Sequence, residues 1–371
     1  MVSKACLVGA YQGKLEEIAA CPDIELTVAV PSSWRDERGR IQLERAHVRG
    51  YQLVVEPLAF NGSFHLHFYP QLGRRMAQVR PDLVHIDEEP YNLATWHALR
   101  LARRQGARSL FFTWQNLDRR YPWPFSSFER DVLRQADAAI AGNEEAVGVW
   151  RAKGFTRPMS VIPQFGVDPQ VFRPAERPAE SAGAGGAFVV GYAGRLVPEK
   201  GIDLLLRAVA LLPGEVRAHI VGSGPQRASL GRLAAELGVA GRVTWTALVP
   251  SAEMPAVLLG FDCLVLPSRT RPNWKEQFGR VLIEALACGV PVIGSASGEL
   301  PNVIGDAGRL FADGDAAALA EQLRQLWQQP EQRARLAARG RERVLARYTQ
   351  RRVAEATLAV YHSLAPAGNG L

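Results

Sequence analysis

Two glutamates, Glu276 and Glu284, stand eight positions apart in the segment EQFGRVLIEALACGVPVIGS. The second lies in an apolar run that predicts a buried helix over residues 279–288, ended by Gly289. A buried carboxylate without partners costs several kcal/mol, so Glu284 needs hydrogen-bond donors. Vicinal hydroxyls of a ribose or hexose would serve, and so would a buried arginine or backbone amides. The spacing leaves these alternatives open.

Two cations stand near the start of another predicted helix. Arg195 and Lys200 lie in a loop between a strand-like run and a helix that begins at about Ile202. Cations beside a helix N-terminus suit a diphosphate, because the free N–H groups and the positive charges act on the same oxygens. The alternative is a pair of surface charges that bind Glu199 and Asp203.

Two glycine-containing turns follow predicted strands. Gly222 and Gly224 in IVGSGPQ would let a nucleotide approach the backbone closely, although such a pair is common. The run LVGAYQGKLEE resembles a phosphate-binding loop that ends in Gly13 and Lys14, but it is one residue short. Leu15 also stands where Ser or Thr would hold magnesium, so an ATPase is excluded.

No metal site is expected. The DGD run at Asp313 resembles a metal-binding motif but directly precedes a helix predicted from Ala316, so a helix-capping role fits better. The four cysteines show no CxxC spacing and indicate buried thiols in a reducing compartment. They are Cys6, Cys21, Cys263 and Cys288.

The elements that would position these residues alternate between short apolar runs and amphipathic ones, which is typical of a doubly wound parallel α/β sheet. In the first half, strands are predicted near Ala5, Leu26, Asp82, Ser109 and Ala138, and helices over Phe68–Val79, Leu93–Gln105 and Phe128–Gln135.

The same pattern starts again after RPAERPAESAGAGGA, a linker-like run that begins at Arg173. Five further strands are predicted near Phe188, Ala218, Val243, Asp262 and Val290. We therefore expect two Rossmann-like domains, at residues 1–172 and 173–349. A long helix over Pro330–Leu364 is predicted, and its last part, about 350–366, is expected to return to the first domain.

The composition is that of an ordinary globular protein with a net charge of +7. The 22 basic and 19 acidic residues up to Arg173 leave +3 there and +4 in the remainder, so no basic tail for nucleic acid is expected. A weak preference for phosphates or anionic membrane surfaces stays open. No apolar run is long enough to cross a membrane, and no signal peptide is predicted. We expect a cytoplasmic protein, with the inner face of the membrane as a further location.

Four segments together resemble one family. GRLVPEKG, VGSGP and EQFGRVLIEALACGVPVI, in this order, are similar to the nucleotide-sugar half of the retaining glycosyltransferases of family 4, and VIPQFGVDPQVF resembles the segment before their domain linker. The resemblance covers most of the second half and, more loosely, the first. It implies the GT-B fold, in which two Rossmann-like doubly wound domains face each other across a cleft.

The resemblance assigns roles to the residues introduced above. Glu276 would contact hydroxyls of the donor sugar, and Glu284 would contact the ribose. Arg195 and Lys200 would grip the donor diphosphate and stabilise the charge that develops on it, so no metal or other cofactor would be obligatory. Arg195, Lys200 and Glu276 are therefore the predicted catalytic residues.

The remaining donor-site predictions concern backbone and apolar groups. Phe278 and Gly279 would turn their amides toward the sugar and phosphate, and Leu282 would lie beside the nucleotide, near Gly222 and Gly224. In the first domain, Gly13 would face the diphosphate.

The acceptor side is predicted from loops of the first domain. Glu88 or Glu89, which follow a strand, would orient an acceptor hydroxyl, and the alternative is that each is a solvated acid of the loop. Gln115 and Asn116 stand where a His-Asp pair is common in the family, so a contact through histidine is not expected. Trp123, between two prolines, would stack on a sugar face or on lipid.

The predicted function is transfer of a sugar from a UDP- or GDP-sugar to a hydroxyl, with retention, in the synthesis of a glycan, polysaccharide or glycolipid. The acceptor would be a sugar or a lipid-linked sugar. The alternatives are a GT-B epimerase or phosphorylase, a nucleotide-sugar-binding protein without turnover, and a peripheral membrane protein that acts through its basic surface.

Overall fold

The computed structural model describes residues 1–36, 39–175 and 186–364. They form two compact units. Unit 1 comprises the described residues of the ranges 1–166 and 350–364, and unit 2 comprises those of the range 167–349. The sequence predicted a boundary after residue 172, whereas the two units divide after Gly166. The segment from Gln350 belongs to unit 1. Most of the predicted linker, residues 176–185, lies outside the described residues.

Unit 2 is built on a six-stranded parallel sheet in the order β11-β10-β9-β12-β13-β14. Chain connections run outward in one direction from β9 and then outward in the other from β12, so these neighbours form the topological switch point. The strands are β9 (Phe188–Ala193), β10 (Val216–Val221), β11 (Val243–Thr246), β12 (Cys263–Leu266), β13 (Val292–Ser295) and β14 (Arg309–Phe311).

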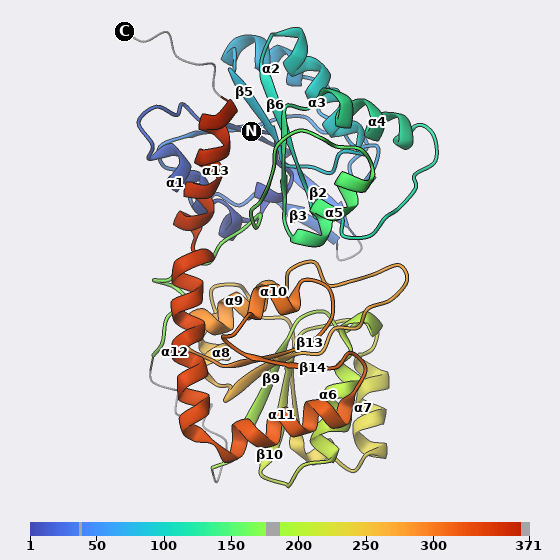
Figure 1. Cartoon of the computed structure of the whole chain (residues 1–371), viewed down its shortest axis with the longest axis vertical. Coiled ribbons are helices and arrows are strands. Elements are labelled where there is room, and N and C mark those ends of the chain that lie inside the picture. The colour runs from blue at the N-terminus through green and yellow to red at the C-terminus, as the bar shows by residue number, and fades with distance from the viewer. Residues whose placement is uncertain (37–38, 176–185, 365–371) are drawn as a thin grey trace. The chain divides into compact units, whose positions relative to one another are not determined.

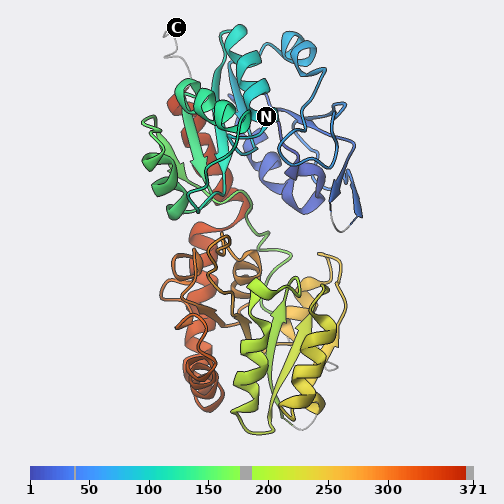
Figure 2. The ribbon, with the colours of Figure 1, turned by 90° about the vertical axis from the view of Figure 1, so that its right-hand side faces the viewer.

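Helices cover both faces of this sheet (Figures 1 and 2). On one face, α6 (Ile202–Ala210) packs against α7 (Arg227–Glu236) and α11 (Ala316–Gln328). On the other, α9 (Arg280–Ala287) packs against α8 (Met254–Leu259), α10 (Leu300–Ile304) and α12 (Pro330–Arg347). Gly279 and Gly289, which flank α9, have φ values of 76° and 73°, the left-handed backbone that glycine tolerates.

Unit 1 also contains parallel strands. β5 (Leu83–Ile86), β6 (Arg108–Thr113), β7 (Ala138–Ala141) and β8 (Met159–Val161) pair in this order, and β1 (Thr27–Val30) pairs with β4 (Gln52–Val55). Val2 forms bridges to Ala29 and Ile86 and so joins the two groups of strands. Between β1 and β4 in the sequence, the chain forms a small antiparallel pair, β2 (Ser33–Asp36) and β3 (Gly39–Gln42).

The predicted first strand near Ala5 is wrong. The chain leaves the sheet after Val2 and forms two 3-10 turns, η1 (Ala5–Leu7) and η2 (Gly9–Tyr11). The Ser3 hydroxyl accepts a hydrogen bond from the Cys6 N–H at 3.2 Å and holds the first turn. Cys6 and Leu7 are buried there, so the apolar run reflects burial in a turn and not pairing in a sheet.

The helices of unit 1 shift slightly from their predicted bounds. The segment predicted from Phe68 becomes helical only at Leu72, and the one predicted from Phe128 begins at Phe125. The helices are α1 (Gly13–Ala19), α2 (Leu72–Val79), α3 (Leu93–Arg104), α4 (Phe125–Gln135), α5 (Glu144–Ala152) and α13 (Gln350–Leu364).

The long terminal helix predicted over Pro330–Leu364 is two helices. α12 ends at Arg347, and Thr349 forms a bridge to Val167 before α13 begins at Gln350. α13 packs along α1 within unit 1 (Figure 1). Among the described residues, we find no helix whose length and apolarity would allow it to cross a bilayer.

Candidate functional site

A lysine and a glutamate from different loops meet at the switch point of the unit 2 sheet. Lys200 ends η4 (Pro198–Lys200), which follows β9, and Glu276 lies in the loop after β12. The Lys200 Nζ is 2.5 Å from Glu276 Oε2. Ligands of open α/β sheets bind outside the carboxyl ends of the strands at such a point. The structure therefore brings together two of the three predicted catalytic residues.

Further groups fix the Glu276 carboxylate, which is 7% exposed. The Ser268 hydroxyl donates a hydrogen bond to the same oxygen, Oε2, at 2.7 Å. The Ser295 hydroxyl, at the end of β13, donates in turn to the Ser268 carbonyl. The Trp274 ring lies 5.1 Å from Lys200 Nζ, a cation–π distance. Ser268 was not predicted, although it lies two residues after the end of β12 and so at the same sheet edge.

Gly201 determines how closely the lysine turn approaches β12. Its φ is 62°, and a Cβ at this position would lie 2.0 Å from the Pro267 carbonyl oxygen. A side chain would therefore push the turn away from the loop that carries Glu276.

Close packing of the backbone explains why glycine occupies positions 222 and 224, without any contact to a nucleotide. Their Cβ atoms would lie 1.9 Å from the Gly194 carbonyl oxygen and 2.4 Å from that of Leu196. The Leu196 N–H donates to the Ser223 carbonyl at 2.9 Å, so the two loops are paired directly. The glycines thereby hold the loop of Arg195, whose side chain is exposed.

Glu284 is buried in α9 and has an arginine partner. Arg280 Nε lies 2.8 Å from Glu284 Oε1, one helical turn away. Burial raises the pKa of Glu284, and the Arg280 guanidinium opposes this rise. The sequence left three kinds of partner open for Glu284: sugar hydroxyls, a buried arginine or backbone amides. In this structure the partner is an arginine, Arg280. The i,i+4 spacing was the available signal for it.

The other donor-site residues pack the turn into α9. A Cβ on Gly279 would lie 2.8 Å from Leu266 Cδ2, so the turn sits tightly on the end of β12. The Leu282 side chain is fully buried, and the Phe278 ring packs edge-on against Tyr348 at 5.8 Å. The backbone of this turn, and not these two side chains, is therefore what a ligand at the sheet edge would meet.

The DGD run acts in the fold. Asp315 caps α11 by accepting a hydrogen bond from the Ala318 N–H at 2.9 Å, which confirms the capping prediction. Asp313 accepts from the Thr270 N–H at 2.8 Å. Within the described ranges, a group of three possible metal ligands occurs only at Cys21, Asp23 and His362, in unit 1.

In unit 1, Glu88 and Glu89 follow β5 but face different partners. Lys4 Nζ lies 3.4 Å from Glu88 Oε2, and His67 Nε2 lies 3.5 Å from Glu88 Oε1. Burial alone would raise the pKa of Glu88, but Lys4 and His67 outweigh it and lower the pKa to about 2. Neither Lys4 nor His67 was predicted, because both are distant in sequence.

Glu89 has neutral partners. It accepts hydrogen bonds from the Thr113 hydroxyl at 2.6 Å and from the Trp114 N–H at 2.8 Å. Burial is the dominant influence and raises the pKa of Glu89 to about 7. Two adjacent carboxyl groups at one sheet edge thus differ widely in their readiness to ionise.

The remaining predicted acceptor residues lie in the loop after β6. Tyr121 donates a hydrogen bond to Gln115 Oε1 at 2.7 Å, while Gln115 Nε2 is buried without a hydrogen-bond partner among the described residues. Asn116 Nδ2 lies 3.1 Å from Glu145 Oε2. Trp123 is 82% exposed.

Gly13 and Lys14 begin α1. Lys14 is buried and donates to the Gln164 carbonyl at 2.7 Å, so its ammonium already has a role within unit 1. A Cβ on Gly13 would lie 3.3 Å from the Gln350 side chain of α13. This close packing favours glycine at position 13 whether or not a diphosphate binds nearby.

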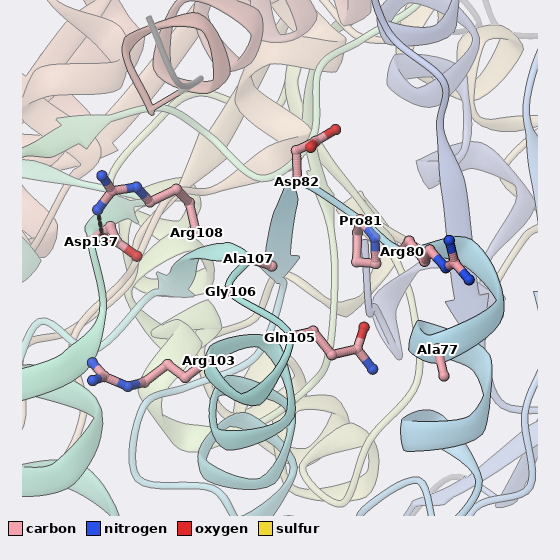
Figure 3. A pocket seen from close by; sticks show the side chains of 10 residues that line it. All are labelled: Ala77, Arg80, Pro81, Asp82, Arg103, Gln105, Gly106, Ala107, Arg108 and Asp137. Carbon is pink, nitrogen blue, oxygen red and sulfur yellow. Dashed lines mark hydrogen bonds and ion pairs between the residues drawn. The ribbon is translucent and has the colours of Figure 1, made fainter.

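An open cavity of about 840 Å³ in unit 1 lies at the opposite edge of its sheet. Asp82, Arg108 and Asp137, which stand at the start of β5, β6 and β7, line it (Figure 3). Arg108 and Asp137 pair at 2.7 Å, and the cavity contains no aromatic side chain. We do not assign it to the catalytic site, because the carboxyl ends of the strands lie elsewhere.

Two family models match this chain. The model described as Glycosyltransferase Family 4 matches residues 20–220, more than half of the chain, and the model described as Glycosyl transferases group 1 matches residues 175–343. Curated relatives include the D-inositol 3-phosphate glycosyltransferases of Mycobacterium tuberculosis and Mycobacterium bovis, with 34% identity over 238 residues. The match covers 61% of this chain but only 47% of those proteins, so the chain spans about half the length of the curated relatives it matches.

Solved structures share the fold along nearly the whole chain. HepE of Anabaena, solved in complex with UDP, has a TM-score of 0.73 at 20% identity, and the match covers 98% of both chains. Sucrose-phosphate synthase of Thermosynechococcus elongatus has a TM-score of 0.72 at 21% identity, with 95% of this chain and 92% of that chain covered. The predicted fold class of two Rossmann-like, GT-B-type units is confirmed.

Proposed function

The chain belongs to glycosyltransferase family 4, and we propose that it moves a sugar from a nucleotide-diphosphate-sugar to a hydroxyl acceptor with retention of configuration. The observation that carries this proposal is the Lys200–Glu276 pair at the switch point of unit 2. A UDP-sugar is favoured over a GDP-sugar because HepE, which shares the fold, was solved with UDP.

Lys200 is suited to hold the leaving diphosphate while it stays near Glu276. An ammonium group has three donors, so it can bind a phosphate oxygen and the Glu276 carboxylate together. As the bond between sugar and diphosphate breaks, negative charge grows on the diphosphate. Lys200 and the exposed Arg195 stabilise that charge, and such preorganised electrostatics is often the largest part of catalysis.

Glu276 binds hydroxyls of the donor sugar in this proposal. Its carboxylate is held by Lys200 and Ser268, so it can accept hydrogen bonds without reorganising. Glu284 receives the ribose, with Arg280 holding Oε1, and the Phe278–Gly279 turn presents its backbone to the phosphate. Leu282 supports the nucleotide side from within the core.

The acceptor in this proposal is a sugar or a lipid-linked sugar that binds the carboxyl edge of unit 1. Glu88 and Glu89 lie at that edge, together with Gln115 and Asn116, and Trp123 is the exposed aromatic of the set. The unpartnered Gln115 Nε2 supports a role in binding an oxygen-rich ligand. We place the reaction in the cytoplasm or at the inner face of the membrane, in the synthesis of a glycan, polysaccharide or glycolipid.

Calorimetric titration of UDP, GDP, ADP and dTDP tests the donor site. We expect one nucleotide, UDP first, to bind the wild type and to lose most of its affinity for an Arg195→Ala, Lys200→Ala double variant. A matched control is Arg207→Ala, Arg232→Ala, which removes two exposed arginines from α6 and α7. If no nucleotide binds, or if both variants bind equally well, the diphosphate assignment is wrong.

Turnover separates the proposal from its alternatives. A transferase consumes the donor sugar faster when a suitable hydroxyl acceptor is present and forms a product with the donor's anomeric configuration. An epimerase would convert the donor without any acceptor. A binding protein without turnover would bind the nucleotide-sugar and leave it intact with every acceptor tried.

A further inference from the structure

A basic and aromatic surface of unit 1 surrounds α4. Two open cavities, of about 830 and 350 Å³, share Arg130 and Arg134 of this helix. We call their combined lining the α4 surface. Its charged and large aromatic residues are Trp96, Arg100, Asp118, Arg119, Arg120, Tyr121, Trp123, Phe128, Glu129, Arg130, Asp131, Arg134, Lys153 and Arg157.

The charge of this surface is strongly positive. Its lining contains seven Arg and Lys residues against three Asp and Glu residues, a local excess of +4 in a chain whose total is +7. Two of the three acids have partners, since Glu129 pairs with Lys153 at 2.8 Å and Asp131 accepts from the Trp96 indole N–H at 2.8 Å. Arg130 and Arg134, one turn apart, are exposed.

The aromatic residues are placed to contact something apolar. Trp123 is 82% exposed, more than any other large hydrophobic side chain of the described residues. In the lining of the same cavity, the Trp96 and Phe128 rings lie 4.9 Å apart, and the Arg100 guanidinium lies 4.7 Å from the Trp96 ring. Indole rings at the polar–apolar boundary, next to arginines, are typical of protein surfaces that sit on bilayers.

The other large cavity of unit 1 provides an internal comparison. Arg80, Arg103 and Arg108 line it with Asp82 and Asp137, so its excess is only +1 (Figure 3). The α4 surface therefore combines a larger excess of basic charge with an exposed indole, whereas this second cavity has no aromatic side chain in its lining.

We infer that the α4 surface docks unit 1 onto a bilayer that contains anionic phospholipids. Its arginines bind headgroup phosphates, and Trp123 enters the interface between headgroups and acyl chains. A free phosphate would use the arginines but would leave the exposed indole without a partner. This inference does not depend on which donor the chain uses. It shares Trp123 with the proposed acceptor site, so Arg130 and Arg134, which are not part of that site, provide the main test.

Vesicle sedimentation of the full chain tests this docking. We expect binding to phosphatidylcholine vesicles only when they also contain phosphatidylglycerol, and weaker binding as salt is raised, because screening shortens the reach of surface charges. An Arg130→Glu, Arg134→Glu variant should lose about tenfold or more in partitioning, since each basic residue near an anionic surface contributes measurably. Trp123→Ala should weaken binding with little change in its salt dependence.

The matched control is Arg80→Glu, Arg103→Glu, which makes the same change in charge at the other cavity. It should bind vesicles much as the wild type does. Thermal melting and nucleotide titration establish that each variant is folded. The inference is overturned if the wild type ignores phosphatidylglycerol, if neutral vesicles bind as well, or if the control loses as much binding. It is also overturned if heparin binds through Arg130 and Arg134 while vesicles do not.

Discussion

The carboxyl edges of the two sheets both present glutamates, but they neutralise them differently. In unit 2, Glu276 meets Lys200, which comes from a different loop across the switch point. In unit 1, Glu88 is held by Lys4 and His67, whereas the Glu89 carboxylate accepts hydrogen bonds from two neutral donors, the Thr113 hydroxyl and the Trp114 N–H.

The difference concerns the proposed donor site in unit 2 and the proposed acceptor site in unit 1. A buried ion pair contributes little net stability, because desolvation opposes the attraction between the charges. Since unit 1 has a buried ion pair too, Lys4–Glu88, it is the position of the Lys200–Glu276 pair at the switch point that favours a ligand there. The hydrogen bonds of Glu89, by contrast, connect the loop after β5 to the end of β6. We expect substitutions of Lys200 to change catalysis, and those of Glu89, a residue of the proposed acceptor site, to change the stability of unit 1 in addition to acceptor binding.

The largest expected effect is that of Lys200→Ala on turnover. Loss of a charge that stabilises the leaving diphosphate should lower kcat/KM by about 10²–10³-fold. Melting temperature should fall as well, because the substitution takes a cation away from the buried Glu276 carboxylate, so kinetics are compared at a temperature where both proteins are folded. Steady-state kinetics with the donor identified by titration gives the measurement. An unchanged kcat/KM would show that Lys200 does not stabilise the leaving group, and the proposed catalytic role of this edge of unit 2 would be wrong.

The next effect concerns pH and Glu89. Its pKa is about 7 in the folded chain against about 4.5 when exposed, so the folded state binds more protons between these values. Stability from this group is therefore present at low pH and lost as pH rises through 7, by roughly 3 kcal/mol in total. Urea unfolding at pH 5 and pH 8 should show a decrease that Glu89→Gln largely removes.

Glu88→Gln is the matched control for that experiment. The pKa of Glu88 is about 2, so its carboxylate is ionised throughout the range from pH 5 to pH 8. Replacing it should lower stability by a similar amount at both pH values and leave the slope unchanged. A flattened slope in this variant, and not in Glu89→Gln, would contradict the assignment of the raised pKa.

The third effect is geometric. Gly201→Ala introduces a Cβ at 2.0 Å from the Pro267 carbonyl oxygen on a backbone with φ of 62°, which should destabilise unit 2 by about 2 kcal/mol or more. Nucleotide affinity should fall too, because the Lys200 turn must move. Gly241→Ala is the control, since no neighbouring atom lies within 4 Å of its added Cβ. Equal stabilities of the two variants would show that the turn adapts freely.

The sequence predicted strands correctly where successive residues of a strand are buried. Strands buried on both faces of a parallel sheet appear as apolar runs, and the runs near Leu26, Asp82 and Phe188 are strands β1, β5 and β9. It missed the three-residue edge strands β8 and β14, whose residues are partly exposed and show no clear pattern. It was wrong near Ala5, where a buried turn has the same composition as a strand.

For the site, motif order indicated which loops matter but not which side chains meet in them. Lys200 and Glu276 are 76 positions apart, and their contact follows from the neighbouring places of β9 and β12 in the sheet. The roles of Ser268 and Lys4 depend on tertiary contacts that no local spacing reveals. The contact of Arg280 with Glu284 could have been predicted from their i,i+4 spacing, because both residues lie in the predicted helix.

The smallest expected effect concerns that helical pair. Arg280→Ala removes the cation beside the buried Glu284, whose pKa is already raised by burial and should rise further. A raised pKa means that stability is present at low pH and lost as pH rises, so the variant should match the wild type near pH 5 and fall below it near pH 8. Because Arg280 is one-third exposed and solvent screens the pair, we expect a loss of about 1 kcal/mol.

Denaturant unfolding at the two pH values measures this loss, and Arg280→Lys, which keeps the charge, should recover part of it. A ribose at Glu284 would supply hydroxyl donors in place of the arginine. Saturating nucleotide should therefore raise the unfolding free energy of Arg280→Ala at pH 8 at least as much as that of the wild type. If the nucleotide stabilises the wild type alone, Arg280 and not Glu284 is the group that the ribose requires.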